Sequence, residues 1–518
     1  MSFARAVLRL VPLSIGLLAF AGLPGARGRA QDAAAAPVAQ PPPTSTQAEL
    51  QERLAAHFGA ARFSGARWGA KVVSLDSGRT LFATGAELRL SPASVSKLYA
   101  GALALDRLGG DYAIVTPVLA AAPVGADGVV AGDVVVSGRG DPGWNPRRAG
   151  KDFRTAFEPF IAVLQAAGAR EIRGDIVADA TWLKGPPHGA GWTVDDMSDY
   201  YGAEVCAITL DENYVDLRVI PAAEPGRPCA VEVRQPAPGL EIDNRTMTLP
   251  ADAKREVRVL RLPGEARVLI EGGLPAGGEP EKAEATIPHP ARWFAACLRE
   301  AVVAAGIAVH GGARGLRWPE PAHPAAVPLG EVRSAPMREL VASLMKPSQN
   351  LKTNLVLAHL GERQRGPDTP AWRRSEELAV AELNAFLARA GISRAHTIFE
   401  EGSGLSRNNL TTADANVRLL QHMAAHREAE AFLASLPVAG VDGSLGRRFK
   451  GTAAEGNMRA KTGTLRYAHS LAGYVTTAAG ERLVFSLMLN RHLATDERSA
   501  REELDAVAVM LARHAGRE

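Results

Sequence analysis

Residues Leu88–Leu105 read LRLSPASVSKLYAGALAL, and the interpretation of the whole chain depends on this stretch. Two serines and a lysine stand at the start of an apolar run whose hydrophobic positions recur at helical spacing. We expect a helix here, with Ser91 as its N-cap and Pro92 at its first position. The simplest interpretation is a capped core helix. The alternative is that Ser94 is a nucleophile with Lys97 as its base.

The spacing of Ser94 and Lys97 allows their side chains to meet, because residues three apart lie on one face of a helix. The positive end of the helix dipole favours a developing alkoxide and disfavours an extra proton on the lysine. Ser343 and Lys346 have the same spacing, but they stand at the predicted end of a helix, where the dipole has the opposite sign. Position therefore favours Ser94.

A second candidate motif is a serine two residues before an asparagine. It occurs at Ser348 and Asn350, in KPSQNLKTN, and at Ser406 and Asn408, in SGLSRNNLTT. In a short turn both side chains can face one cleft, where the hydroxyl relays a proton and the carboxamide holds a peptide carbonyl. For Ser406 we favour an ordinary turn.

A third candidate motif, Lys461-Thr462-Gly463, occurs once, inside a predicted strand and followed by Thr464. Glycine at this point would let a substrate backbone approach as an added strand, and the lysine and threonine would supply a charge and a hydroxyl for a terminal carboxylate. Taken alone, the motif is also compatible with an ordinary surface strand.

The order of the three motifs is informative. Ser-x-x-Lys, Ser-x-Asn and Lys-Thr-Gly, in that order, are typical of penicillin-binding proteins and class A β-lactamases. The chain also resembles the D-alanyl-D-alanine carboxypeptidase/endopeptidase family, the low-molecular-mass class C penicillin-binding proteins. The resemblance spans about residues 70 to 490 and is carried by SPASVSK, GRGDP, GDIVADATW, EEGSGLSRNNL, LPVAGVDGSLGRRF and RAKTGTL.

The resemblance implies a penicillin-recognising domain interrupted by smaller domains between the first two motifs, and here 254 residues separate Ser94 from Ser348. Sequence patterns agree with this architecture, because β-type runs fill the interval and helices return after it. We predict a three-layer α/β domain, transpeptidase/β-lactamase-like, formed by residues 48–110 and 330–518. The β-rich insertion, residues 111–329, would comprise two subdomains. The Lys71–Thr84 hairpin would share its sheet with the late strands.

The resemblance also implies roles for individual residues. Ser94 would be the acylated nucleophile and Lys97 its general base, while Ser348 would pass a proton to the leaving nitrogen. Asn350 would orient the substrate amide and Lys461 would tune the field around Ser348. Thr462, Gly463 and Thr464 would bind the substrate, with the N–H groups of Ser94 and Thr464 as oxyanion hole.

Two positions depart from the family pattern. Gln349 stands where aspartate is usual, and Glu401 stands where aspartate is more frequent. Neither is an expected catalytic group, so the departures concern substrate preference rather than the reaction. The Arg139–Asp141 triplet, RGD, lies inside GRGDP and is interpreted as a turn.

The first thirty residues have the pattern of a secretory signal peptide, with arginines before an apolar stretch that is too short for a permanent membrane span, which needs about 20 residues. Residues 31–47 are rich in alanine and proline and are predicted to be a linker. Cleavage near Ala30 would remove four arginines and change the net charge from +3 to −1. The near-neutral charge argues against a nucleic-acid partner.

The three cysteines leave two interpretations open: a Cys206–Cys229 bridge with Cys297 unpaired, or three buried thiols. No metal site or other cofactor is expected, because no ligand motif occurs in the sequence.

We therefore predict a serine D-Ala-D-Ala carboxypeptidase, D,D-endopeptidase or both, periplasmic or otherwise exported, acting on peptidoglycan stem peptides and inhibited by β-lactams. No transmembrane anchor would remain after cleavage, and peripheral membrane contact stays open. A serine β-lactamase and a non-catalytic peptidoglycan-binding protein are the alternatives.

Overall fold

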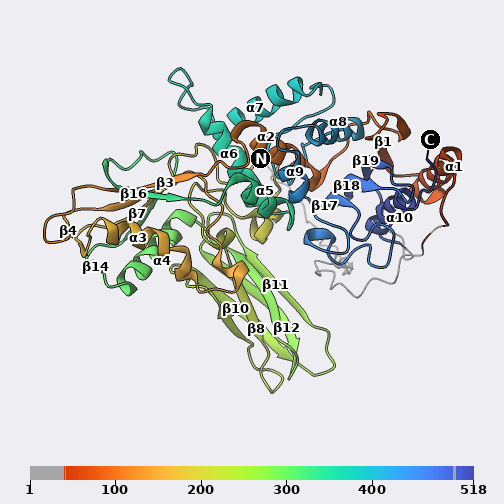
Figure 1. Ribbon diagram of the computed structural model, residues 1–518. Helices are drawn as coiled ribbons and strands as arrows, with labels where there is room; N and C mark the ends of the chain where they lie inside the picture. Colours follow the sequence, from red (N-terminus) through yellow and green to blue (C-terminus); the bar gives the residue numbers. More distant parts are fainter. Residues whose placement is uncertain (1–39, 41, 494–497, 518) are drawn as a thin grey trace, which may run out of the picture. The chain divides into compact units, whose positions relative to one another are not determined.

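The structure is a computed structural model that describes residues 40, 42–493 and 498–517 (Figure 1). The predicted signal peptide and most of the predicted linker lie outside the described residues. Among the described residues, no helix combines the length and the apolar character that a membrane crossing requires.

A five-stranded antiparallel sheet brings together the two ends of the described chain. The order is β17-β18-β19-β1-β2, so β17 and β2 are its edges. This confirms that the early hairpin and the late strands share one sheet. The strands are β1 (Arg67–Ser74), β2 (Thr80–Thr84), β17 (Arg459–Leu465), β18 (Ala468–Thr476) and β19 (Arg482–Asn490).

Helices cover both faces of this sheet. Successive side chains of each strand point to opposite faces, so each face packs into its own hydrophobic core. Val72 of β1 packs into a core with α1 (Gln47–Phe58) and α10 (Ala500–Ala512), and Figure 1 shows α10 beside β18 and β19. The next residue, Val73, packs into the core on the opposite face. The helices of that face are α2 (Lys97–Leu108), α5 (Met337–Met345), α6 (Asn350–Arg363), α7 (Ser375–Arg389), α8 (Ala413–Ala424) and α9 (Ala429–Ser435). The predicted three-layer α/β arrangement is confirmed.

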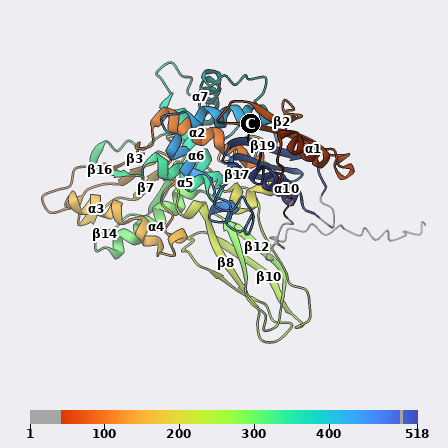
Figure 2. The ribbon, with the colours of Figure 1, turned by 45° about the vertical axis from the view of Figure 1, so that its right-hand side comes forward.

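Between α2 and α5 the chain forms four further sheets around one hydrophobic core. Their orders are β15-β7-β5-β3-β16, β14-β6-β4, β10-β12-β11 and β13-β8-β9, and the long strands β8, β10 and β12 run side by side in Figures 1 and 2. Two helices pack in this region, α3 (Glu158–Ala166) and α4 (Pro290–Ala304).

The strands of this region are β3 (Val115–Ala120), β4 (Val129–Val130), β5 (Val134–Ser137), β6 (Glu171–Ile172), β7 (Ile176–Asp179), β8 (Tyr214–Ile220), β9 (Ala230–Val233), β10 (Glu241–Leu249), β11 (Glu256–Arg261), β12 (Arg267–Pro275), β13 (Glu281–Thr286), β14 (Ala308–Val309), β15 (Ala313–Leu316) and β16 (Val327–Arg333). The β-rich character of the insertion is therefore present, and β16 continues past the predicted boundary at residue 329. The assignment of domains stays a prediction.

The prediction that Ser91 is the N-cap of the following helix was wrong. A 3₁₀ turn, Ala93–Ser96, comes first, and α2 begins only at Lys97. The Ser91 hydroxyl has no hydrogen-bond partner among the described residues, and the backbone of Ser91 is instead held by the Asn490 carboxamide of β19. Ala93 has a φ of +47°, in the left-handed region, so the chain turns sharply just before Ser94.

Of the two interpretations left open for the cysteines, the structure has the second: all three are free and buried, and Cys206 and Cys229 form no bridge. The Cys229 sulfur faces the hydroxyl of Thr248 at 3.8 Å, and the Cys297 sulfur lies 3.9 Å from the Pro236 carbonyl oxygen. Burial raises the pKa of both Cys206 and Cys297 to about 12, so these thiols stay protonated.

Candidate active site

The sharp turn at Ala93 places Ser94 in the 3₁₀ turn that leads into α2, and the first residue of that helix, Lys97, is fully buried beneath it. Lys97 Nζ lies 2.8 Å from Ser94 Oγ. Ser94 itself is half-buried, so its hydroxyl lies between the buried amine and the surface. The predicted pairing of these two side chains is present.

Lys97 has two further contacts, both with oxygens that can only accept hydrogen bonds. Its Nζ donates to Asn350 Oδ1 at 2.7 Å and to the Ser403 carbonyl oxygen at 2.6 Å. A neutral amine has two protons and one lone pair, so these oxygens use both protons and leave the lone pair for the Ser94 hydroxyl.

The pKa of Lys97 agrees with this arrangement. Burial lowers it to about 7, and the carboxylate of Glu401 opposes the change by raising it. A lysine with such a pKa is largely neutral in mildly alkaline solution and can accept a proton from a neighbouring hydroxyl.

A second serine and lysine pair lies in the same site. Ser348 has a φ of +62° in the short connection between α5 and α6, and Lys461 Nζ of β17 lies 2.7 Å from its Oγ. The same nitrogen donates to the Thr462 carbonyl oxygen at 2.9 Å. Burial, with a smaller contribution from Lys97, holds the pKa of Lys461 well below its usual value. The Ser-x-Asn and Lys-Thr-Gly motifs thus converge on the turn that holds Ser94.

Gly463 makes this convergence sterically feasible. A β-carbon at this position would lie 2.2 Å from Ser470 Oγ, 2.4 Å from the Pro92 carbonyl oxygen and 3.1 Å from the Ser94 amide nitrogen. We expected the glycine to admit a substrate backbone. Its open side is instead occupied by the turn that leads into Ser94, so the glycine lets β17 pack against the nucleophile's own backbone.

The two threonines of the third motif differ in exposure. Thr462 is half-buried and its Oγ1 lies 2.8 Å from Ser444 Oγ, whereas Thr464 is exposed. Because β17 is an edge strand, one side of it lacks a neighbouring strand, and an extended peptide could add there with its terminal carboxylate near these hydroxyls.

Sequence reasoning missed the turn that supports Lys97. Glu401 is fully buried, and its carboxylate accepts hydrogen bonds from the amides of Ser403 at 2.8 Å and Gly404 at 2.6 Å. A β-carbon on Gly404 would lie 1.9 Å from the Ala93 carbonyl oxygen, so this turn packs directly against the Ser94 turn. In the sequence, EEGSGLS contributes to the family resemblance and Glu401 departs from it. Nothing there marks the stretch as a support of Lys97, because the partner of the lysine is a backbone carbonyl.

The insertion also reaches the site. Asn350 Nδ2 donates to the carbonyl oxygen of Tyr201 at 2.9 Å, so the same carboxamide connects Lys97 to the inserted region. Gln349, the departure in the second motif, is the N-cap of α6 and accepts from the Lys352 amide.

The two competing pairs lie elsewhere. Lys346 donates to Leu436 and Asp442, away from Ser343, whose hydroxyl bonds within its own helix. Ser406 and Asn408 both donate to Glu400, as expected for an ordinary turn. Within residues 40, 42–493 and 498–517, no three His, Cys, Asp or Glu side chains group so that they could hold a metal ion.

Known proteins are similar to this chain over most of its length. The family model described as the D-Ala-D-Ala carboxypeptidase 3 (S13) family matches residues 50–514. A D-alanyl-D-alanine carboxypeptidase of Actinomadura sp. is 33% identical over 485 residues, which cover 91% of this chain and 86% of that protein.

Solved structures share the fold. The crystal structure of penicillin binding protein 4 (dacB) from Haemophilus influenzae has a TM-score of 0.74 at 22% identity and covers 86% of this chain and 95% of its own. The same protein in complex with a β-lactam has a TM-score of 0.69, with the same identity and coverage.

Proposed function

The chain belongs to the D-Ala-D-Ala carboxypeptidase 3 (S13) family of serine enzymes, and we propose that it cleaves D-Ala-D-Ala bonds of peptidoglycan stem peptides through an acyl-enzyme at Ser94. The terminal D-alanine of a stem peptide, a D,D cross-link or both would be its targets. The observation that carries the proposal is the buried Lys97 amine, whose contacts leave only the Ser94 hydroxyl to donate a proton to it.

Acylation would begin with proton transfer from Ser94 Oγ to neutral Lys97. The oxygen attacks the carbonyl carbon of the penultimate D-alanine, and the carbonyl oxygen becomes an oxyanion. The amides of Ser94 and Thr464 would stabilise this charge, and the close approach at Gly463 supports such a pair because it brings β17 to within van der Waals reach of the Ser94 amide.

Collapse of the intermediate would break the bond to the last D-alanine and return the carbonyl. The leaving nitrogen needs a proton, and Ser348 supports its delivery because its hydroxyl lies 2.7 Å from Lys461 Nζ. As Ser348 protonates the leaving nitrogen, the proton that Lys97 took from Ser94 would replace the one that Ser348 gives up, so that Lys97 is neutral again. Water would then attack the acyl-enzyme and give a proton to Lys97, which returns it to Ser94 Oγ as the ester bond breaks and the shortened peptide leaves.

Recognition of the substrate would use its free carboxylate. The exposed hydroxyl of Thr464 and the half-buried hydroxyl of Thr462 lie on the edge strand, where a carboxylate could accept from them. The four-membered ring of a β-lactam presents a strained amide to the same nucleophile, so covalent inhibition forms part of the proposal. So does export, because peptidoglycan lies outside the cytoplasm.

Digestion of purified muropeptides tests the function. We expect mass spectrometry to show loss of one alanine from pentapeptides, conversion of cross-linked dimers to monomers, or both. The Ser94→Ala protein should release neither product. Intact muropeptides after prolonged digestion with the unaltered protein would refute the proposal, and sustained rapid turnover of a penicillin would favour a β-lactamase instead.

A further inference from the structure

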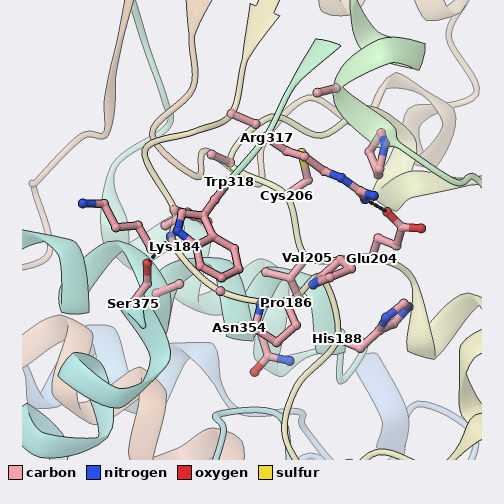
Figure 3. A pocket seen from close by; sticks show the side chains of 18 of the residues that line it. Lys184, Pro186, His188, Glu204, Val205, Cys206, Arg317, Trp318, Asn354 and Ser375 are labelled. Carbon is pink, nitrogen blue, oxygen red and sulfur yellow. Dashed lines mark hydrogen bonds and ion pairs between the residues drawn. The ribbon is translucent and has the colours of Figure 1, made fainter. Parts of the chain in front are cut away.

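A cavity of about 460 Å³ lies between the inserted strands and helices α6 and α7 (Figure 3). In the described part of the chain, none of the residues proposed for catalysis lines it. Its volume falls in the range of small-molecule binding sites. The cavity is therefore separate from the site around Ser94.

The cavity nevertheless lies close to that site along α6. Asn354, which lines it, is one helical turn after Asn350 and on the same face of the helix. Asn354 Oδ1 accepts from the amides of Gly402 at 3.1 Å and Ser403 at 3.2 Å, in the turn whose carbonyl holds Lys97.

Much of the wall is apolar and includes one large aromatic ring. Trp318, Pro186 and Val205 group around the centre of the cavity in Figure 3, and Leu183 and Leu357 also line it. Trp318 is only partly buried, so part of the indole is available to a ligand. Such a ring offers a flat surface to the C–H groups of a small molecule.

The charged side chains of the cavity do not leave a fixed charge at its centre. Arg317 Nη1 is paired with Glu204 Oε2 at 3.2 Å, and the Lys184 ammonium group points away from the other side chains in Figure 3. Arg292, Glu320 and Arg374 also line the cavity and are exposed. The remaining charges therefore lie on exposed or outward-pointing side chains rather than at the centre.

Uncharged hydrogen-bonding groups remain without partners. Asn354 is 4% exposed, and neither its Nδ2 nor the buried Nε2 of His188 has a hydrogen-bond partner within the described residues. Burial lowers the pKa of His188 to about 4, so its imidazole is neutral. Burial and the charge of Glu401 raise the pKa of Glu376 to about 8, so its carboxyl is largely protonated at neutral pH.

We propose that this cavity binds an uncharged pyranose of the N-acetylated amino-sugar class, with its apolar face on Trp318 and its hydroxyl or amide groups on His188, Asn354 and Glu376. A pyranose fits because it combines an apolar face with several neutral donors and acceptors. The proposal relies on the function proposed above only for the origin of the sugar, which the glycan strand of peptidoglycan would supply. The cavity is thus a glycan site beside the peptide site.

The test is a calorimetric titration of the full chain with a peptide-free trisaccharide of N-acetylglucosamine. We expect saturable binding to the unaltered protein and about tenfold weaker binding to Trp318→Ala, the loss that one aromatic contact typically causes. His188→Ala is the second variant and should also bind more weakly. Trp372→Ala is the matched control, because Trp372 is 71% exposed and does not line the cavity.

The Ser94→Ala protein should bind the trisaccharide as tightly as the unaltered protein, which separates this proposal from the proposed reaction. Absence of saturable binding to the unaltered protein would overturn it. So would equal affinity of Trp318→Ala and His188→Ala with the control, or displacement of the sugar by a sugar-free stem pentapeptide, which would make the cavity a peptide site.

Discussion

The protonation state of Lys97 should set the pH dependence of acylation. The lysine is fully buried, its pKa is lowered to about 7, and only its neutral form can accept the Ser94 proton. The rate of acylation by a β-lactam should therefore rise with pH in proportion to the neutral fraction and reach a plateau above the pKa.

The size of the effect follows from that pKa. With a value of about 7, about one-tenth of the lysine is neutral at pH 6 and about nine-tenths at pH 8, so the rate should rise about tenfold over this interval and little more above it. A lysine with its ordinary pKa of 10.5 would give a rate that still rises about tenfold per pH unit beyond pH 9.

The assay is the second-order rate of labelling by a fluorescent penicillin between pH 5.5 and 9.5. The control is Glu401→Gln. Because the Glu401 carboxylate raises the pKa of Lys97, its removal should move the rising part of the curve of labelling rate against pH to lower pH. Circular dichroism at each pH shows whether both proteins remain folded. A labelling rate that keeps rising beyond pH 9, or a rate curve that moves to higher pH in Glu401→Gln, would refute the reasoning.

Three other predictions follow from individual contacts. Gly463→Ala should lower the free energy of unfolding by about 1–3 kcal/mol in chemical denaturation, because its β-carbon would overlap the Pro92 carbonyl oxygen. The same variant should react with the fluorescent penicillin more than about 100-fold more slowly. A normal rate of labelling would show that the close approach of β17 to the Ser94 turn is unnecessary. Lys461→Met should slow labelling by about 10²–10⁴-fold, because Ser348 loses its hydrogen-bond partner. Lys346→Met is the control and should be labelled normally, because the native Lys346 amine bonds to Leu436 and Asp442 instead. Equal rates for the two variants would contradict the role of Lys461. A thiol reagent should modify no cysteine in the native protein and all three in guanidinium chloride, and a deficit after unfolding would reveal a disulfide.

Much of the fold could be predicted because its signals are local. The alternating residues on both sides of Asp76 specify a hairpin, and the periodic segments after residue 336 form α5, α6 and α7 as expected. The start of α2 could not be predicted in the same way. The positive φ of Ala93 belongs to a turn enclosed by distant residues, Gly404 and Gly463, and local capping rules do not contain these contacts.

The groups of the candidate site likewise fall into those that the sequence could predict and those that it could not. The side chains of Ser94, Lys97, Ser348, Asn350 and Lys461 were all named from their spacing and resemblance, and the structure brings them together. Two groups that act on the protonation of Lys97 beside Asn350 were missed. One is a backbone carbonyl, at Ser403, and the other is a buried carboxylate, Glu401, whose importance depends on a turn that forms only in the folded chain.

The position of the acyl group tests the central claim most directly. The protein is treated with a penicillin, digested and analysed by tandem mass spectrometry. We predict one adduct, on the Ser94 hydroxyl, and none in the Ser94→Ala protein under the same conditions. An adduct on any other residue, or undiminished labelling of Ser94→Ala, would contradict the account.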